Sequence, residues 1–148
     1  MENKRDLFQL LTRRFGLLNK NCCTAEGLDI STVHSLILYE IDKQQGPTMQ
    51  QIADTLAIDV TTFSRQIQTL IKLQLVSKSP SPDDKRYYIL ALTEQGHKTA
   101  QAIEKSMNAY LDEIFSHMNE FEQETVLRSI KLLNNAMAKS SVCCIPYL

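Results

Sequence analysis

The segment from Thr48 to Leu92 constrains the fold most, because signals for two short helices and a β-hairpin follow one another there without a gap. Thr48 and Gln51 fit a capping box, in which each side chain bonds to the backbone amide of the other residue. Asp59 can cap a second helix by accepting hydrogen bonds from its first free amides. The apolar residues of that helix share one side and predict a buried stripe: Val60, Phe63, Ile67 and Leu70.

The opposite side of the second helix carries short polar side chains and one arginine: Thr61, Thr62, Ser64, Arg65, Gln68 and Thr69. Most helix exteriors are polar only because water covers them. Hydroxyl, amide and guanidinium groups are also the groups that contact phosphates and base edges in DNA. The capped helix before this surface and the basic hairpin after it favour a DNA contact over a merely solvated face.

Two β-prone runs, at about residues 75–78 and 86–92, flank a tip that contains two prolines and ends in Lys85 and Arg86. Two helices, a tight turn and a basic hairpin in this order predict a winged helix-turn-helix. In that fold the second helix enters the major groove, where Arg65 would reach the O6 and N7 atoms of guanine. The hairpin would bring Lys85 and Arg86 to the neighbouring minor groove or backbone.

The rest of the chain is expected to be helical, so the fold class is mainly α with a small β-hairpin wing. Apolar residues recur at helical spacing over about residues 5–20, and Thr93 can cap a long helix that follows the hairpin. A last helix is expected from about Glu120 to Ser140. Five of its residues form an apolar stripe that is expected to be buried: Phe121, Leu127, Ile130, Leu133 and Met137.

We expect a single domain over residues 1–148, with the winged helix-turn-helix in residues 30–93. Residues 1–29 and 94–148 would supply dimerisation helices, because the small winged helix-turn-helix cannot cover all of their apolar stripes. A second copy of the chain is the natural partner, with long helices interlocking around a two-fold axis.

The distribution of charge agrees with a localised DNA contact. The net charge is only −1, but basic residues outnumber acidic ones five to three between Asp59 and Arg86. No apolar run approaches the roughly 20 residues that cross a bilayer, and the N-terminus does not resemble a signal peptide. We therefore expect a cytoplasmic protein that does not bind a membrane. The sequence motifs of zinc proteases, serine hydrolases and phosphate-binding loops are absent, so we expect no enzyme.

Four segments together resemble the MarR family of bacterial transcriptional regulators: residues 49–54 (MQQIAD), 70–76 (LIKLQLV), 84–86 (DKR) and 90–96 (LALTEQG). The resemblance extends over nearly the whole chain. Its most specific part is the pair of segments at residues 84–86 and 90–96. One departure is Gln74, where the family usually has glycine in the turn after the recognition helix, so some backbone strain is expected there.

The resemblance implies a homodimer on a pseudo-palindromic operator, which represses nearby genes. It implies that the protein is released from DNA when a small molecule, an oxidant or a metal binds between the winged helix-turn-helix and the dimerisation helices. It also implies that Asp84 and Arg86 pair to shape the tip of the wing, and that Arg86 reaches the minor groove.

Two adjacent cysteine pairs, Cys22-Cys23 and Cys143-Cys144, follow the first and last expected helices. Cytosolic thiols stay reduced, so a disulfide framework is not expected. One interpretation is thiols without a regulatory role. A second is a sensor site for a thiophilic metal or metalloid ion, such as As(III), Cu(I) or Zn, which thiolates prefer. A third is oxidation of the thiols. No cofactor is required in any of these.

Two further hypotheses remain open: a regulator of the same fold that responds to a small organic ligand, and a winged helix that binds another protein. His34 falls beside an apolar stripe and is expected to be a hydrogen-bonded core or pocket residue. The other two histidines are expected to be exposed on helices: His97 and His117. Three tyrosines are candidates for lining a ligand cleft or for packing: Tyr39, Tyr87 and Tyr88.

Overall fold

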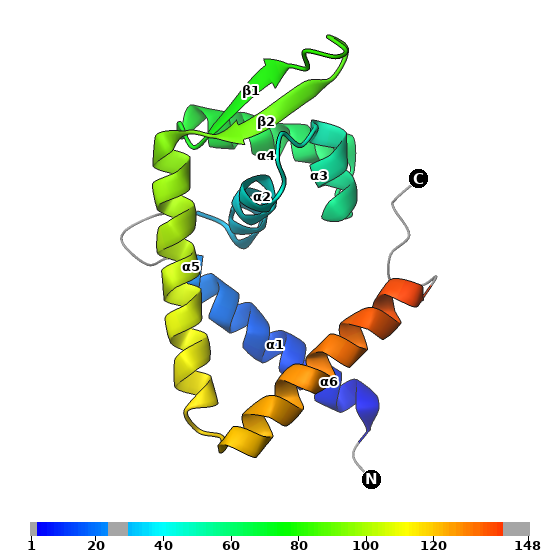
Figure 1. Cartoon of the computed structure of the whole chain (residues 1–148), viewed down its shortest axis with the longest axis vertical. Helices are drawn as coiled ribbons and strands as arrows, with labels where there is room; N and C mark the ends of the chain where they lie inside the picture. The colour runs from blue at the N-terminus through cyan, green and yellow to red at the C-terminus, as the bar shows by residue number, and fades with distance from the viewer. Residues whose placement is uncertain (1–2, 24–29, 141–148) are drawn as a thin grey trace.

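The computed structural model describes residues 3–23 and 30–140, which form six helices and one two-stranded antiparallel sheet (Figure 1). The elements are α1 (Lys4–Cys23), α2 (Thr32–Lys43), α3 (Met49–Thr55), α4 (Val60–Lys72), β1 (Val76–Pro80), β2 (Tyr88–Leu92), α5 (Glu94–Phe115) and α6 (Glu120–Lys139). The expected class, mainly α with a small hairpin in a winged helix-turn-helix, is confirmed.

The helix starts follow the capping residues that the sequence indicates. The Thr48 hydroxyl accepts from the Gln51 amide at 3.1 Å, and the Gln51 side chain accepts from the Thr48 amide at 2.8 Å. The Asp59 carboxylate accepts from the amide of Thr62 at 3.0 Å. Each cap satisfies amides that have no partner inside their own helix.

The hydrophobic core lies where α2, α3, α4 and the hairpin meet, and we call this part of the molecule the head. Its fully buried side chains come from all four elements: Ile37, Leu38, Ile52, Phe63, Ile67, Leu70 and Leu90. The prediction that Val60 is buried is wrong, because this residue is 50% exposed at the first position of α4.

The hairpin is bonded to the segment that precedes α3. β1 and β2 pair in a register that sets Val76 opposite Leu92 and Pro80 opposite Tyr88. The Leu90 amide donates to the carbonyl of Pro47 at 2.9 Å, just before α3 begins. The wing therefore has a defined position relative to α3.

The turn between α4 and β1 contains Gln74 in the left-handed region, with φ of +60°. A side chain in that conformation costs about 1–2 kcal/mol relative to glycine. Two hydrogen bonds hold the residue there: its amide donates to Ile71 at 2.9 Å, and its carbonyl accepts from the Thr93 hydroxyl at 2.6 Å. The departure from glycine is therefore accommodated at a local cost.

Long helix α5 leaves the head directly after the hairpin, and α6 begins at its far end (Figure 1). Helix α1 contacts both α5 and α2. The stripe of α6 that was expected to be buried is exposed, and this correction concerns Phe121, Leu127, Ile130, Leu133 and Met137. The reason is that α6 extends away from the head, so no described element of the same chain covers that stripe.

None of the helices within the described residues is long and apolar enough to cross a membrane.

Candidate nucleic-acid interface and the adjoining cavity

The polar side of α4 faces outward, opposite the buried side that packs into the head. Five of its six candidate residues are exposed, and Ser64 is half-buried: Thr61, Thr62, Ser64, Arg65, Gln68 and Thr69. Helical spacing brings them onto one face because residues three and four apart are neighbours. The Thr69 hydroxyl donates to the carbonyl of Arg65 at 3.2 Å, which leaves its oxygen free to accept.

The N-terminus of α4 is already occupied by a carboxylate. Hydrogen bonds from the side chain and the amide of Thr62 lower the pKa of Asp59. Asp59 is therefore ionised at neutral pH and sits where a phosphate would otherwise meet the helix dipole. At this end of α4, the groups that remain available to a phosphate are the side chains of Thr61 and Thr62.

The wing carries an ordered arginine. The Arg86 guanidinium forms an ion pair with Asp84 at 2.8 Å, and the Arg86 amide donates to the same carboxylate at 3.0 Å. The side-chain bond and the amide bond of Arg86 both lower the pKa of Asp84, and the side-chain bond raises the pKa of Arg86. The pairing that the family resemblance implies is present. The Arg86 side chain is nevertheless 84% exposed, so its remaining N–H groups face solvent.

Two tyrosines on the wing are exposed, and one of them contacts a lysine, which the sequence analysis did not predict. Tyr87 and Tyr88 are exposed and do not line the cavity described below. The ammonium group of Lys78 lies 4.3 Å from the centroid of the Tyr88 ring, a cation–π contact across the two strands. This contact holds a positive charge on one face of the hairpin.

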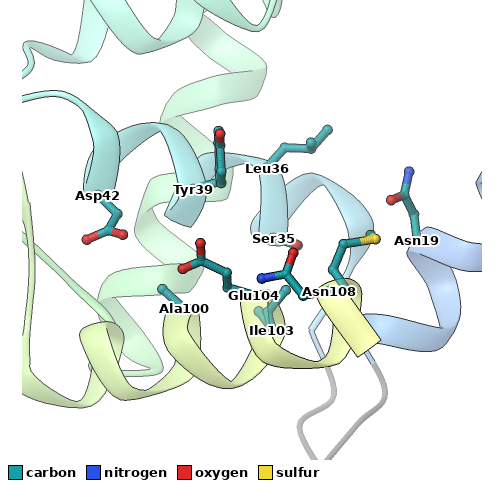
Figure 2. Close-up of a pocket in the computed structure, with 10 residues that line it drawn as sticks. Asn19, Ser35, Leu36, Tyr39, Asp42, Ala100, Ile103, Glu104 and Asn108 are labelled. Atoms are coloured by element: carbon teal, nitrogen blue, oxygen red, sulfur yellow. The ribbon is translucent and has the colours of Figure 1, made fainter. Parts of the chain in front are cut away.

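A cavity of about 270 Å³ lies between α1, α2 and α5 (Figure 2). Its lining combines apolar side chains with carboxylate, amide and hydroxyl groups: Asn19, Ser35, Leu36, Tyr39, Asp42, Ala100, Ile103, Glu104, Met107 and Asn108. Of the three tyrosines considered from the sequence, Tyr39 lines it. The other members could not be grouped from the sequence, because they come from three helices that only the fold brings together.

The histidines make no common site. The interpretation of His34 as a hydrogen-bonded residue is wrong for the described residues, since none of them offers a hydrogen-bond partner to its two buried ring nitrogens. His97 and His117 are exposed, as expected, and each faces a carboxylate: Nδ1 of His97 lies 3.5 Å from Asp42, and Nε2 of His117 lies 2.8 Å from Glu113.

The cysteine hypothesis is not tested by the structure. Cys143 and Cys144 lie outside the described residues, and so do the side chains of Cys22 and Cys23. Among the described residues there is no cluster of three or more side chains suited to hold a metal ion.

Comparisons with known proteins agree with this arrangement. A sequence profile described as MarR family matches residues 28–86. The HTH-type transcriptional regulator YhbI of Bacillus subtilis is 29% identical over 85 residues, which cover 57% of this chain and 53% of that protein. The chain thus matches about half the length of this relative.

Two other similar proteins align over more of the chain. The HTH-type transcriptional regulator BilQ of Clostridium symbiosum is 24% identical over 80% of this chain and 81% of its own. The crystal structure of Streptococcus pneumoniae FabT in complex with DNA has a TM-score of 0.79 at 19% identity, covering 92% of this chain and 98% of FabT. The structural likeness establishes the fold.

Proposed function

We propose that the chain is a transcriptional regulator of the MarR family that binds operator DNA as a homodimer and represses transcription. The MarR-family profile that matches residues 28–86 and the similarity to HTH-type transcriptional regulators support this proposal. The observation that carries the proposal is the exposed polar face of α4 beside a wing whose arginine is held by Asp84. These two surfaces belong to one head, because Leu70 of α4 and Leu90 of β2 share its buried core. The Leu75 amide, just before β1, also donates to the carbonyl of Leu70 at 3.0 Å.

In this proposal α4 lies in the major groove. The exposed guanidinium of Arg65 donates to guanine, and the hydroxyl and amide side chains around it bond to phosphates or base edges. A bidentate arginine contributes about 1–3 kcal/mol of discrimination against a wrong base.

The wing then reaches the adjoining minor groove or the backbone. Arg86 is presented in a fixed orientation by its bonds to Asp84, so little rotamer entropy is lost when it contacts DNA. Lys85 at the tip and Lys78 on β1 supply further positive charge toward phosphates.

The apolar stripes left exposed on α1 and α6 support a dimer. Large hydrophobic side chains remain on both helices, among them Leu7, Leu11, Phe15, Phe121, Leu127 and Leu132. A patch of this extent marks a protein interface, and a two-fold partner covers the same stripe with its own copy. We therefore assign dimerisation to residues 1–29 and 94–148, and DNA binding to residues 30–93 of the single domain.

Release from DNA is proposed to follow ligand binding in the cavity. The cavity joins α2, which belongs to the head, to α5, which leads toward the proposed dimer helices. A ligand there changes the angle between them and so the spacing of the two heads. A second candidate signal is a thiophilic ion or an oxidant at the two cysteine pairs, favoured by their doubled occurrence in the sequence.

The test is fluorescence anisotropy on DNA from upstream of the protein's own gene, with Arg65→Ala and Arg86→Ala compared with the intact chain. Arg128→Ala is the matched control, because this arginine lies on α6, outside the head, and forms an ion pair with its neighbour Glu124. Each head variant should weaken binding by about tenfold or more. A lost phosphate contact should also lower the salt slope by about 0.9.

If both head variants bind as tightly as the control, the proposed interface is wrong. Binding that is weak, independent of DNA sequence and insensitive to salt would instead indicate that the winged helix contacts another protein.

A further inference from the structure

We propose that the cavity between α1, α2 and α5 selects a compact ligand in which a cationic nitrogen, a protonated amine or a quaternary ammonium, is attached to an apolar body. Only the regulatory consequence of binding rests on the proposed function; the charge preference of the cavity follows from its lining.

The charged side chains that line the cavity are both carboxylates, Asp42 on α2 and Glu104 on α5. Among the described residues that line it, none is a lysine, an arginine or a histidine. Figure 2 shows the Glu104 carboxylate extending from α5 toward α2 and the Asp42 carboxylate extending from the end of α2, while the ring of Tyr39 points away from α5. An anionic ligand would enter this space without any lining group to neutralise it, whereas a cation would meet two opposite charges.

Glu104 is the stronger anchor, because its carboxylate has no hydrogen bond or ion pair within the described part of the chain. Lys105 follows it on α5, but the two make no ion pair there. Glu104 is exposed on α5, so its carboxylate is accessible to a ligand that donates hydrogen bonds and carries positive charge.

The protein's own cations already take positions at the edge of this site. The Lys43 ammonium lies 5.3 Å from the centroid of the Tyr39 ring, and His97 faces Asp42 at 3.5 Å. Both contacts use the chemistry that a cationic ligand would use, namely an aromatic face and a carboxylate. Neither residue lines the cavity itself, so both leave room for a ligand.

The remaining lining suits an apolar body of limited size. Leu36, Ile103 and Met107 provide the hydrophobic surface. A volume of about 270 Å³ is just below the usual range for small-molecule pockets, so a single ring with a short side chain fits better than a large polycyclic compound.

Binding of a cation would act on the joint between the head and α5. A cation between Asp42 and Glu104 draws α2 and α5 together and competes with His97 for Asp42. The ligand would therefore change the contact between His97 on α5 and Asp42 on α2.

The test uses three probes with the same phenyl ring, namely phenethylammonium, 2-phenylethanol and 3-phenylpropanoate, in isothermal titration of the full-length protein without DNA. The cation should bind about tenfold more tightly than the other two. Glu104→Gln keeps the size of the side chain but removes its charge, so it should abolish most of this preference. Glu113→Gln is the matched control on the same helix, outside the cavity.

Equal or tighter binding of 3-phenylpropanoate or 2-phenylethanol overturns the proposal. So does an unchanged preference in Glu104→Gln, or the absence of saturable binding of phenethylammonium at millimolar concentration. Since no DNA is present, these outcomes are separate from the proposed function. Retained cation binding without any effect on an operator complex would refute the regulatory step alone.

Discussion

The close approach of α5 to the turn after α4 makes Gly96→Ala a sharp test of how the head is joined to the long helix. A Cβ built at Gly96 would lie 3.0 Å from the carbonyl carbon of Leu75 and would overlap its oxygen. That oxygen accepts the Thr93 amide at 3.1 Å, and the Thr93 hydroxyl is bonded to Gln74. Because the obstacle is hydrogen-bonded backbone, it cannot move without breaking this junction.

The expected loss of stability combines three contributions. Forcing an extra methyl group into a packed site costs about 1–3 kcal/mol. Weakening one backbone hydrogen bond adds about 1 kcal/mol, while alanine gains about 0.5–1 kcal/mol over glycine within a helix. The free energy of unfolding should therefore fall by about 2 kcal/mol, which corresponds to a Tm lower by roughly 4–8 °C for a chain of this size.

The assay is thermal unfolding followed by circular dichroism, with Gly16→Ala as the matched control. Gly16 also lies inside a helix, but nothing comes within 4 Å of a Cβ built there. The control should therefore raise stability by about 0.5–1 kcal/mol. A Gly96→Ala protein that melts at or above the temperature of the unaltered chain would refute the described contact between α5 and Leu75.

Three further predictions concern the cap, the dimer and the thiols. Asp59→Ala should lower the Tm at neutral pH, while Asp59→Asn keeps the helix cap. Because the pKa of Asp59 is lowered in the folded protein, the stability that its carboxylate contributes is present above the ordinary value of 3.8 and is lost as the pH falls through the folded value. The Tm values of the unaltered protein and of Asp59→Ala should therefore converge in acid. Phe121→Asp should shift the protein toward monomer in sedimentation velocity with its helical spectrum retained, since this side chain is 76% exposed in the single chain; an unchanged dimer would place the interface elsewhere. Replacing Cys143 and Cys144 by Ser should abolish release from the operator by arsenite or Cu(I), and unchanged release would exclude these thiols as the sensor.

Short-range signals in the sequence were sufficient for the elements and their starts. Thr48, Asp59 and Thr93 each accept a hydrogen bond from an amide three residues ahead, so the whole interaction lies within one short segment. The pairing of Asp84 with Arg86 is equally local. Helical periodicity also separated the polar side of α4 from the side that packs into the head.

His34 illustrates where periodicity stops being informative. It shares the buried side of α2 with Ile37, Leu38 and Ile41, at spacings of three, four and seven residues. The pattern therefore indicated burial, but it carried no information on whether an acceptor would lie near the ring. The described structure provides none.

The amino-acid sequence alone determined the winged head, because caps, turns and stripes are interactions between residues a few positions apart. Only the tertiary structure decided that Asp42 and Glu104 line the same cavity and that Gly96 must pass beside Leu75. It also decided that the apolar stripe of α6 stays exposed in the described part of the chain. The physical reason is that a helical repeat tells which side chains share a face, while the element that meets that face is set by how distant segments pack.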